Sequence, residues 1–600
     1  MGVWLFAIGL AFMSEQVSQG GEENWATFLQ SEWSATALAN IALVTALLML
    51  TVAFLTRLLS VGVGLVGAGV FILHLVNAFK VTFRNEPFYP WDFSLAGETG
   101  NILSDINLQF TDPMIYGMIY LLVGILGAVV LDIFVLKRIR MRYYKEAILG
   151  GITLLFCVLC FNQRFSLDYL KENEVQVVTW EPLKSYQKNG FIYSFIRSFH
   201  DAQVSEPQGY SEEAVTALTD AAAQKAKESG AQKEPNIIVI MSEAFMDLER
   251  AENLTFEREL TPRFNALSKQ YLSGRVMTSE YGGGTANSEF EVLTGYSTYG
   301  LPAGSIAYAS YVNGEVGNYV SYLNERNYNT VALHPYQRSF FSREKAYEVL
   351  GFDAFYSEEH FTDAERIRNM SYVSDMALTE RIIAEYEASA QKGEPFFCHA
   401  VSMQNHASYD PNEFGDQTIH MESTAELSDY DRTAIETYAT GISKTDEALG
   451  ALVDYFEAVE EPTVVIFFGD HQPYFSATVG LAEAIGYESG TDAEKAFYRH
   501  STPYLIWNNF EEQPTHAEAD FSMYQLLSYA TEKLGMIRPA YYYYLDEFRA
   551  EIAGATRQVT LLPNGEKIVG MTEEAKKQFD AYWMVTYDLL LGKEYLKDLY

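Results

Sequence analysis

The sequence has 600 residues and a formal net charge of −37, which is enough chain for a membrane region plus one large or two medium soluble domains. So acidic a chain lacks the clustered Lys and Arg that displace phosphate counterions, which excludes nucleic acid as a partner. Residues 1–163 hold 8 Lys and Arg against 11 Asp and Glu, so the negative charge belongs mainly to the remainder.

Apolar stretches dominate the first part of the chain. The segment Val3–Met13 is too short to cross a bilayer alone, and it lacks the basic start and small-residue cleavage site of a signal peptide, so we interpret it as a truncated or short span. Four further stretches are long enough, or nearly so: Ala35–Leu55, Val61–Ala78, Met114–Leu136 and Ala147–Phe161. The sequence therefore predicts a multi-pass membrane region of four to five helices over residues 1–163.

A basic cluster between the third and fourth of these stretches predicts their orientation. Its members are Lys137, Arg138, Arg140, Arg142 and Lys145. Because short loops rich in Lys and Arg stay in the cytoplasm, the last span leads outward and everything after Arg164 is predicted to be extracellular. An aromatic outer loop, Phe83–Phe93, favours an interfacial belt over a contact with a lipid substrate.

Residues 164–234 are predicted to form juxtamembrane helices and a linker. "NGFIYSFIRSFH" has the pattern of an amphipathic helix on a membrane surface, and Ser211–Glu228 opens with a capping serine and two acids, as a solvated helix does. The three cysteines, Cys157, Cys160 and Cys398, cannot build a disulfide framework.

Residues 235–600 are predicted to be an α/β domain with a mainly parallel central sheet. Continuous apolar runs of strand length, typical of strands buried on both faces, occur at Ile237–Met241, Phe396–Met403, Thr463–Asp470 and Pro503–Asn508. Helical patterns such as Ser374–Ala390 and Asp431–Glu457 alternate with them, as in parallel α/β sheets.

Candidate metal ligands follow two of these strands. Glu243 stands after the first, and Asp470 and His471 end the third in "FFGDHQP". Ligands of open α/β sheets bind beyond the carboxyl ends of strands, so these groups predict a divalent-metal site that needs one more ligand.

Thr285, after the glycines of "YGGGTANSEF", is the candidate for that ligand and for a nucleophile, since a hydroxyl at a helix start and near a cation loses its proton more easily. The alternative is that Thr285 is only a helix N-cap after a glycine turn.

Two other features favour structural roles. His399 lies within an apolar run and is interpreted as a hydrogen-bonded core histidine. The aromatic run Ala540–Phe548, "AYYYYLDEF", favours a packed strand or sheet edge over a carbohydrate-binding stack.

Four motifs in combination resemble the lipoteichoic acid synthase and phosphoglycerol transferase family of the alkaline phosphatase and sulfatase superfamily. They are "SEAF" after a strand, "GGGTANSEFEVLTG", "NH" after the "FFCHAVSMQ" strand, and "GDHQP". The resemblance covers nearly the whole chain and implies a sulfatase-like fold. It implies a manganese site formed by Glu243, Thr285, Asp470 and His471, with Mg²⁺ as the alternative ion and Thr285 as the nucleophile.

The resemblance also implies substrate contacts. His406 matches a histidine that contacts the substrate phosphate or assists proton transfer, and His334 and Arg343 in "HPYQRSFFSRE" match a headgroup-binding segment. An arginine can hold phosphate oxygens bidentately. Tyr336 and Phe341 depart from the family pattern, where an acidic residue and a tryptophan are usual, which leaves the acceptor open.

The function that the resemblance implies is transfer of glycerolphosphate from phosphatidylglycerol to a lipoteichoic-acid-type polymer or a glycolipid, through a phosphothreonine-type intermediate. The partners are then those substrates and membrane lipids, and the location is the cell membrane with the catalytic domain outside. The alternatives are a phosphoethanolamine transferase or phosphodiesterase on the same scaffold, and a catalytically silent envelope scaffold.

Overall fold

The computed structural model describes residues 2–31, 33–84, 87–95, 110–136, 142–173, 175, 182–201, 204–368, 372–411, 413–475 and 480–600. The chain forms two compact units. The first consists of Met1–Val204 and Pro302–Gly304, and the second of Ser205–Leu301 and Ser305–Tyr600.

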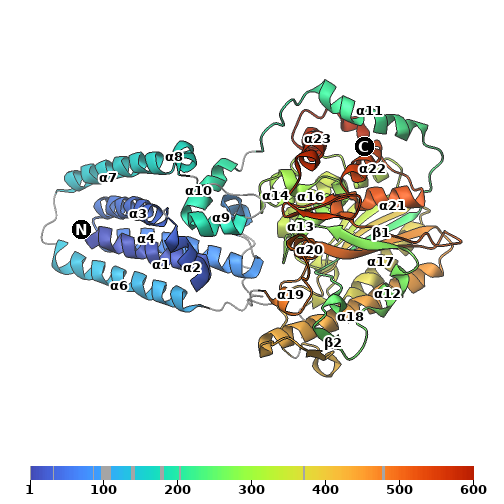
Figure 1. The fold of residues 1–600 in the computed structure, drawn as a ribbon, viewed down its shortest axis with the longest axis horizontal. Helices are drawn as coiled ribbons and strands as arrows, with labels where there is room; N and C mark the ends of the chain where they lie inside the picture. The colour runs from blue at the N-terminus through green and yellow to red at the C-terminus, as the bar shows by residue number, and fades with distance from the viewer. Residues whose placement is uncertain are drawn as a thin grey trace. The chain divides into compact units, whose positions relative to one another are not determined.

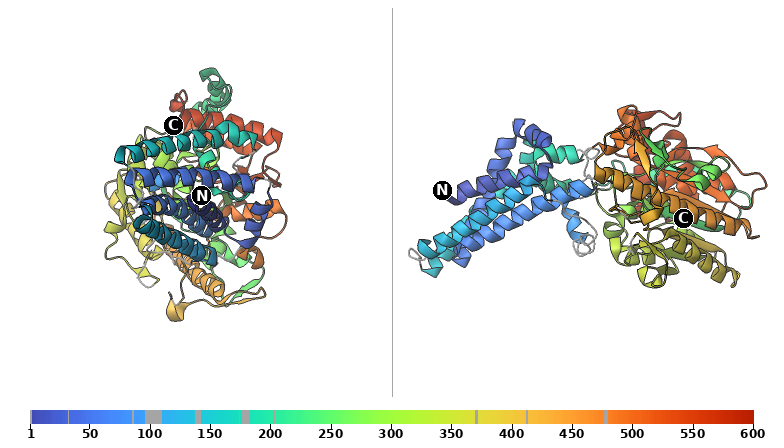
Figure 2. Two further views of the ribbon diagram at one scale, coloured as in Figure 1. Left: turned by 90° about the vertical axis from the view of Figure 1, so that its left-hand side faces the viewer. Right: turned by 90° about the horizontal axis from the view of Figure 1, so that it is seen from below.

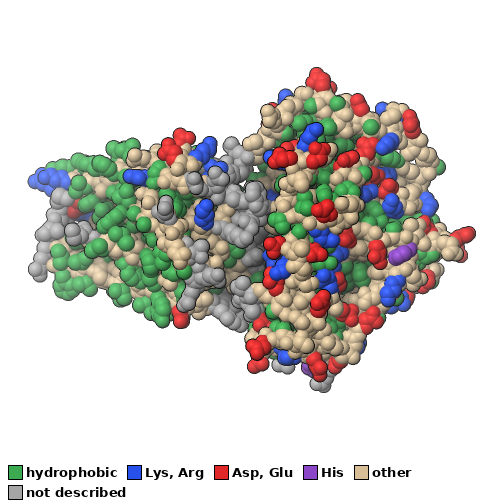
Figure 3. All heavy atoms as spheres, in the orientation of Figure 1, with side chains coloured by type: hydrophobic (Ala, Val, Ile, Leu, Met, Phe, Trp, Pro, Cys, Tyr) green, Lys and Arg blue, Asp and Glu red, His purple; other side chains and the backbone are tan. Residues whose placement is uncertain are grey.

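The first unit is helical (Figure 1). Four of its helices are long and apolar enough to cross a membrane: α3 (Ser34–Thr56), α4 (Leu59–Arg84), α6 (Asp112–Phe134) and α7 (Tyr143–Arg164). Within the bundle α3 packs against α4 and α7, and α4 packs against α6 (Figure 2). Large apolar side chains such as Leu65, Leu122 and Leu126 point outward and are more than half exposed, and green side chains cover this unit in Figure 3. Such a surface is the one that lipid solvates. The four predicted apolar helices are therefore confirmed, with the length and composition that a membrane span needs, and their crossing of a membrane stays a prediction.

The segment Val3–Met13 belongs to the longer helix α1 (Gly2–Gln19), whose C-terminal end is polar yet buried. There the Oε1 atom of Glu15 accepts hydrogen bonds from Gln19 Nε2 and from the backbone of Phe191. These contacts fix α1 inside the first unit, and its crossing of a membrane stays a prediction. Of the predicted basic cluster, Lys137, Arg138 and Arg140 lie outside the described residues.

The predicted juxtamembrane region divides between the two units. Helices α8 (Leu167–Glu172), α9 (Pro182–Asn189) and α10 (Phe191–Asp201) belong to the first, together with α2 (Glu22–Gln30) and the short η1 (Pro90–Leu95). Helix α11 (Glu212–Glu228) belongs to the second and packs against α22 (Ala540–Glu551) and α23 (Glu573–Leu590). Ser211 caps α11, accepting a hydrogen bond from the Ala214 backbone, as the sequence predicts.

A nine-stranded sheet forms the centre of the second unit, in the order β12-β3-β11-β10-β1-β8-β4-β5, with β13 also paired to β3. Strands β10 (Thr463–Gly469), β1 (Asn236–Ser242), β8 (Phe396–Val401), β4 (Asn329–Leu333) and β5 (Ala354–Tyr356) run parallel. Strand β11 (Ser501–Asn508) is antiparallel to β10 and to β3 (Leu272–Met277). The sheet is therefore mainly parallel, as predicted, with antiparallel pairing on one side.

Helices cover both faces of this sheet (Figure 1), and every residue of β1, β8 and β10 is buried. Ile238 and Ile240 pack into a core that includes residues of α17 (Asp375–Ala390) and α18 (Asp429–Glu457), two helices that the sequence predicts. Burial on both faces explains why the strands appear in the sequence as unbroken apolar runs.

The aromatic run at 540–548 is a helix, α22, and not the predicted strand or sheet edge. Tyr541, Tyr544, Leu545 and Phe548 recur at helical spacing and are buried. Phe548 stacks on Tyr582 of α23 with 4.4 Å between ring centroids. Tertiary packing of a helical face here overrides the β-propensity of single tyrosines.

The remaining elements of the second unit are shorter. They are β2 (Leu254–Phe256), β6 (Arg366–Ile367), β7 (Tyr372–Val373), β9 (Met421–Ser423), β12 (Ala517–Glu518), β13 (Phe521–Ser522), β14 (Gly554–Ala555), β15 (Val559–Leu561), β16 (Lys567–Val569), α12 (Pro262–Ser268), α13 (Thr285–Thr294), α14 (Ala307–Ser310), α15 (Tyr319–Asn324), α16 (Arg343–Leu350), α19 (Leu481–Ala484), α20 (Asp492–Arg499), α21 (Leu526–Leu534) and the 3₁₀ turns η3 (Leu248–Arg250), η4 (Thr298–Gly300), η5 (Phe340–Ser342), η6 (Glu358–His360), η7 (Gly415–Gln417), η8 (Met523–Gln525) and η9 (Lys597–Leu599).

Candidate active site and metal centre

The register of two parallel strands brings the predicted acidic ligands together. Ser242, the last residue of β1, lies opposite Gly469, the last residue of β10. The residues that follow, Glu243 and Asp470, therefore leave the sheet side by side at its carboxyl edge. One ligand atom from each of these carboxylates and one from His471 lie within 4.8 Å of one another.

Asp470 uses its two carboxylate oxygens differently. Oδ1 accepts hydrogen bonds from the backbone N–H groups of Ala244, at 2.7 Å, and His471, at 2.8 Å. Oδ2 is buried and has no hydrogen-bond partner among the described residues, and it lies 3.2 Å from His471 Nε2. A buried carboxylate oxygen without a donor costs free energy unless a cation or proton satisfies it.

The orientation of His471 suits a metal ligand. Its Nδ1 lies 3.1 Å from the carbonyl oxygen of Gln472, and since a carbonyl only accepts, Nδ1 carries the proton. The Nε2 lone pair is then available and lies 3.9 Å from Oε1 of Glu243. Imidazoles that bind metals are commonly fixed in this way by a hydrogen bond from the other ring nitrogen.

The charge balance of the cluster also fits a divalent cation. Burial raises the pKa of Glu243 well above its ordinary value, and the neighbouring Asp470 raises it further. Two buried carboxylates at this separation repel each other, and a cation between them would reverse that effect. The donor set of two carboxylates, an imidazole and a nearby hydroxyl therefore fits a divalent metal ion such as Mn²⁺, Mg²⁺ or Zn²⁺.

The glycine triplet positions Thr285 beside this cluster. Gly284 is the N-cap of α13, with φ of 90°, and a Cβ atom there would lie 1.9 Å from Oε2 of Glu280. Gly282 donates a backbone hydrogen bond to the carbonyl of Gln472, which joins the glycine loop to the "GDHQP" loop. The backbone angle at 284 favours glycine, and a Cβ atom there would require the Glu280 side chain to move.

Thr285 is therefore the first residue of the helix and not its N-cap, contrary to the structural alternative considered for it. Its Oγ1 lies 3.5 Å from Nε2 of His471. The hydroxyl therefore lies both at the helix N-terminus and beside the candidate metal cluster. The predicted roles of Thr285 as a metal ligand and as a nucleophile both require this position.

His334 follows β4 at the same carboxyl edge of the sheet. Its Nδ1 lies 3.1 Å from the carbonyl oxygen of Val401, so Nδ1 donates and Nε2 is left as an acceptor. Burial and the positive charge of Arg343 lower the pKa of His334 to about 3. His334 is neutral at physiological pH, so any substrate contact it makes is as a neutral imidazole.

Arg343 is 1% exposed and forms a buried ion pair. Its Nε and Nη2 atoms lie 2.9 and 2.6 Å from Oε1 of Glu289, and Nη1 lies 3.4 Å from the carbonyl oxygen of Phe340. The guanidinium edge that a phosphate would use for a bidentate contact is thus taken by Glu289. The substrate contact of Arg343 stays a prediction, whereas its ion pair is a feature of the fold.

Glu289 is a residue that the sequence analysis missed. Tyr347 donates a hydrogen bond to its Oε2 atom, and His399 Nε2 lies 3.9 Å from the same oxygen. His399 is a buried core residue, as predicted, but neither of its ring nitrogens makes the predicted hydrogen bond among the described residues. Only the place of Glu289 one turn after Thr285 in "TANSEFE" could have indicated this carboxylate.

His406 lies in the loop after β8, with Nδ1 2.6 Å from the carbonyl oxygen of Ala407. Arg368, also missed from the sequence, is buried and holds this loop by donating to the carbonyl oxygens of Gln404, His406 and Ser408 and by pairing with Glu413. The loop is thereby fixed at the edge of the sheet where β1 and β10 also end.

Residues 235–533 match the sulfatase family model. A putative cyclic beta-1,2-glucan modification protein of Rhizobium meliloti (strain 1021) is 27% identical over 551 residues, which cover 87% of this chain and 82% of the relative. Lipoteichoic acid synthase 1 of Bacillus subtilis (strain 168) is 24% identical over 359 residues, and the matched part spans about half of that relative, 51%.

Among solved structures, the phosphoglycerol transferase GacH of Streptococcus pyogenes, in complex with sn-glycerol-1-phosphate, aligns with a TM-score of 0.55. The two sequences are 22% identical, and the alignment covers 66% of this chain and 99% of that one. This likeness shows a shared fold for the second unit and confirms the predicted sulfatase-like architecture.

Proposed function

We propose that this chain is a membrane-bound phosphoglycerol transferase with Thr285 as its nucleophile, carried by the region that matches the sulfatase family model, residues 235–533. The observation that carries the proposal is the position of the Thr285 hydroxyl. It lies 3.5 Å from Nε2 of His471, at the edge of a cluster that also contains Glu243 and Asp470. A silent scaffold would have no need to keep all four groups together.

In the first half-reaction, the oxygen of Thr285 attacks the phosphorus of phosphatidylglycerol. The Thr285 hydroxyl loses its proton, a bond forms between its oxygen and phosphorus, and the bond from phosphorus to the diacylglycerol oxygen breaks. The diacylglycerol oxygen takes up one proton, so the half-reaction is neutral in protons overall. A bound divalent cation, Mn²⁺ in our proposal, would lower the pKa of the hydroxyl and neutralise charge on the phosphoryl oxygens.

The residues of the chain perform the remaining steps. Glu243, Asp470 and His471 would hold the cation, and the fixed helix start holds the Thr285 oxygen toward it. We assign His406 as the proton donor to the diacylglycerol oxygen and the neutral His334 as a hydrogen-bonding contact to the headgroup. An acceptor hydroxyl then attacks the glycerolphosphate ester and releases Thr285.

The membrane helices fit a lipid donor. Phosphatidylglycerol is presented at a bilayer surface, and tethering the catalytic domain there raises the effective concentration of the headgroup. We propose that the catalytic unit lies on the outer side, because the basic loop between α6 and α7 is expected in the cytoplasm.

For the acceptor, the likeness to a protein named for cyclic beta-1,2-glucan modification supports a carbohydrate hydroxyl beside the glycolipid and polymer acceptors of the synthases. The cysteines argue against the disulfide-bonded phosphoethanolamine transferases, since all three are free and Cys398 alone lies in the second unit.

The test incubates the full chain, in detergent or vesicles, with labelled phosphatidylglycerol and Mn²⁺. Wild type is expected to release diacylglycerol and to retain label covalently, Thr285→Ala to do neither, and Thr285→Ser to retain part of both activities. Label trapped on Thr285 would be located by mass spectrometry. Equal release by wild type and Thr285→Ala would reject the nucleophile, and release from phosphatidylethanolamine alone would favour the other transferase class.

A further inference from the structure

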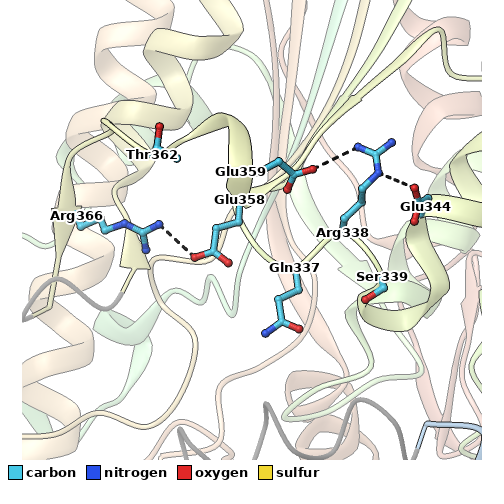
Figure 4. A pocket seen from close by; sticks show the side chains of 8 residues that line it. All are labelled: Gln337, Arg338, Ser339, Glu344, Glu358, Glu359, Thr362 and Arg366. Carbon is cyan, nitrogen blue, oxygen red and sulfur yellow. Dashed lines mark hydrogen bonds and ion pairs between the residues drawn. The ribbon is translucent and has the colours of Figure 1, made fainter.

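An open hollow of about 790 Å³ lies on the second unit, outside the metal cluster. It is lined by polar side chains from two segments, one that runs from the end of β4 into α16 and one that runs from the end of β5 into β6. Figure 4 shows these side chains. Gln337 lies between the Arg366–Glu358 ion pair on one side and the ion pairs of Arg338 with Glu344 and Glu359 on the other. No residue of the hollow belongs to the predicted metal site.

The hollow lies at the same edge of the sheet as the catalytic groups. Its two segments begin at the carboxyl ends of β4 and β5, which run parallel to β1. Backbone hydrogen bonds join them, from His334 to the carbonyl of Tyr356 and from Glu358 to the carbonyl of Tyr336. Strand β4 is two places from β1, which corresponds to about 10 Å along the sheet.

The charged groups of the hollow are paired with one another. Arg338 Nε lies 2.9 Å from Glu344, and its Nη1 lies 3.7 Å from Glu359. Arg366 lies 3.2 Å from Glu358. Three carboxylates thus outnumber two guanidinium groups, so a polyanion such as a poly(glycerolphosphate) chain would be repelled and would find no free cation there.

A neutral polyhydroxyl ligand fits this lining better. Its hydroxyl groups donate to carboxylates and accept from guanidinium and amide N–H groups, so they can insert into the existing network without a change of net charge. The carboxylates are accessible, since the side chains of Glu344, Glu358 and Glu359 are 57%, 42% and 53% exposed.

We propose that this hollow is the acceptor subsite and that it binds a neutral glucan whose hydroxyl receives the glycerolphosphate. The inference rests on the proposed transferase function and narrows its acceptor to an uncharged oligosaccharide. The net charge of the lining indicates a neutral ligand. The position of the hollow at the catalytic edge of the sheet indicates that this ligand is the acceptor.

The test separates the acceptor step from the donor step. Thr362 lines the hollow and is exposed, so Thr362→Trp places a large ring in it. The matched control is Thr216→Trp, which makes the same change on an exposed position of α11. A third variant, Glu359→Gln, removes one carboxylate charge and keeps the side-chain shape.

Binding of β-1,2-linked glucose oligosaccharides to the full chain is measured directly by calorimetry, and transfer is measured with labelled phosphatidylglycerol. We expect Thr362→Trp to weaken oligosaccharide binding at least about tenfold and Glu359→Gln about fivefold, with Thr216→Trp unchanged. The early release of diacylglycerol, which reports the donor step, should be equal in all four proteins.

Equal oligosaccharide binding by Thr362→Trp and Thr216→Trp would overturn the proposal. So would tighter binding of a glycerolphosphate polymer than of the neutral oligosaccharide, or tighter polymer binding in wild type than in Glu359→Gln. A wild type that binds the oligosaccharide but releases no diacylglycerol would reject the transferase function and leave a carbohydrate-binding hollow, so the two failures are distinguishable.

Discussion

Arg343 and Glu289 form an ion pair that is buried on both sides, with 2.6 Å between Nη2 and Oε1. Glu289 stands one helical turn after Thr285 on α13, and Arg343 begins α16. The pair therefore ties the helix of the proposed nucleophile to the segment that also carries His334. Burial opposes ionisation of Glu289, but Arg343 and the neighbouring His399 together outweigh it and lower the pKa of Glu289 to about 2.

Glu289→Gln is expected to destabilise the fold strongly, because it leaves a buried guanidinium without its counter-charge, at a cost of about 3–5 kcal/mol. Thermal unfolding of the full chain in detergent measures this. The control is Glu547→Gln, which breaks the exposed pair with Lys225 and should cost less than about 1 kcal/mol. Equal losses in the two variants would show that the buried pair has no special weight.

Gly284→Ala should reduce both stability and diacylglycerol release. The new Cβ meets the Glu280 carboxylate at 1.9 Å and also forces alanine into a φ of 90°. Gly535→Ala separates the two effects, because Gly535 has φ of 64° and no atom within 4 Å of the added Cβ. We expect about 1 kcal/mol for the backbone angle alone and a larger loss at 284. Similar melting temperatures for both variants would contradict the close approach.

Metal binding should stabilise the folded chain. At a Mn²⁺ concentration 100 times the dissociation constant, mass action gives about 2.7 kcal/mol, visible as a rise in melting temperature that a chelator reverses. Asp470→Asn should lose this rise. Asp446→Asn is the control, since Asp446 accepts backbone hydrogen bonds from Arg263 and Phe264 and its loss should lower the melting temperature without removing the response to Mn²⁺. A full Mn²⁺ response in Asp470→Asn would remove that residue from the metal site.

The depressed pKa of His334 predicts a pH dependence of stability. The folded pKa of about 3 lies below the ordinary 6.5, so the unfolded chain binds the proton first and the stability present above pH 6.5 is lost as the pH falls toward 3. His334→Asn should flatten this part of the stability curve. His420→Asn, at a side chain that is 69% exposed, should not. Parallel curves for wild type and His334→Asn would reject the neutral buried imidazole.

The sequence alone determined the four long apolar helices, the buried strands and the residues that end these strands. These follow from local patterns, since lipid and a two-sided sheet each demand unbroken apolar runs, and since ligands gather where parallel strands end. It also led to Thr285, because three glycines before a helix start permit a close approach that other residues forbid.

Only the tertiary structure decided the pairing of Ser242 with Gly469, which places Glu243 beside Asp470. It also decided that Gly284 and not Thr285 caps α13, and that 540–548 is a helix. Arg343 shows the reason most clearly, because its partner Glu289 lies 54 residues away in the chain. No local sequence pattern predicts such an ion pair, because its strong attraction depends on the burial that removes water from both charges.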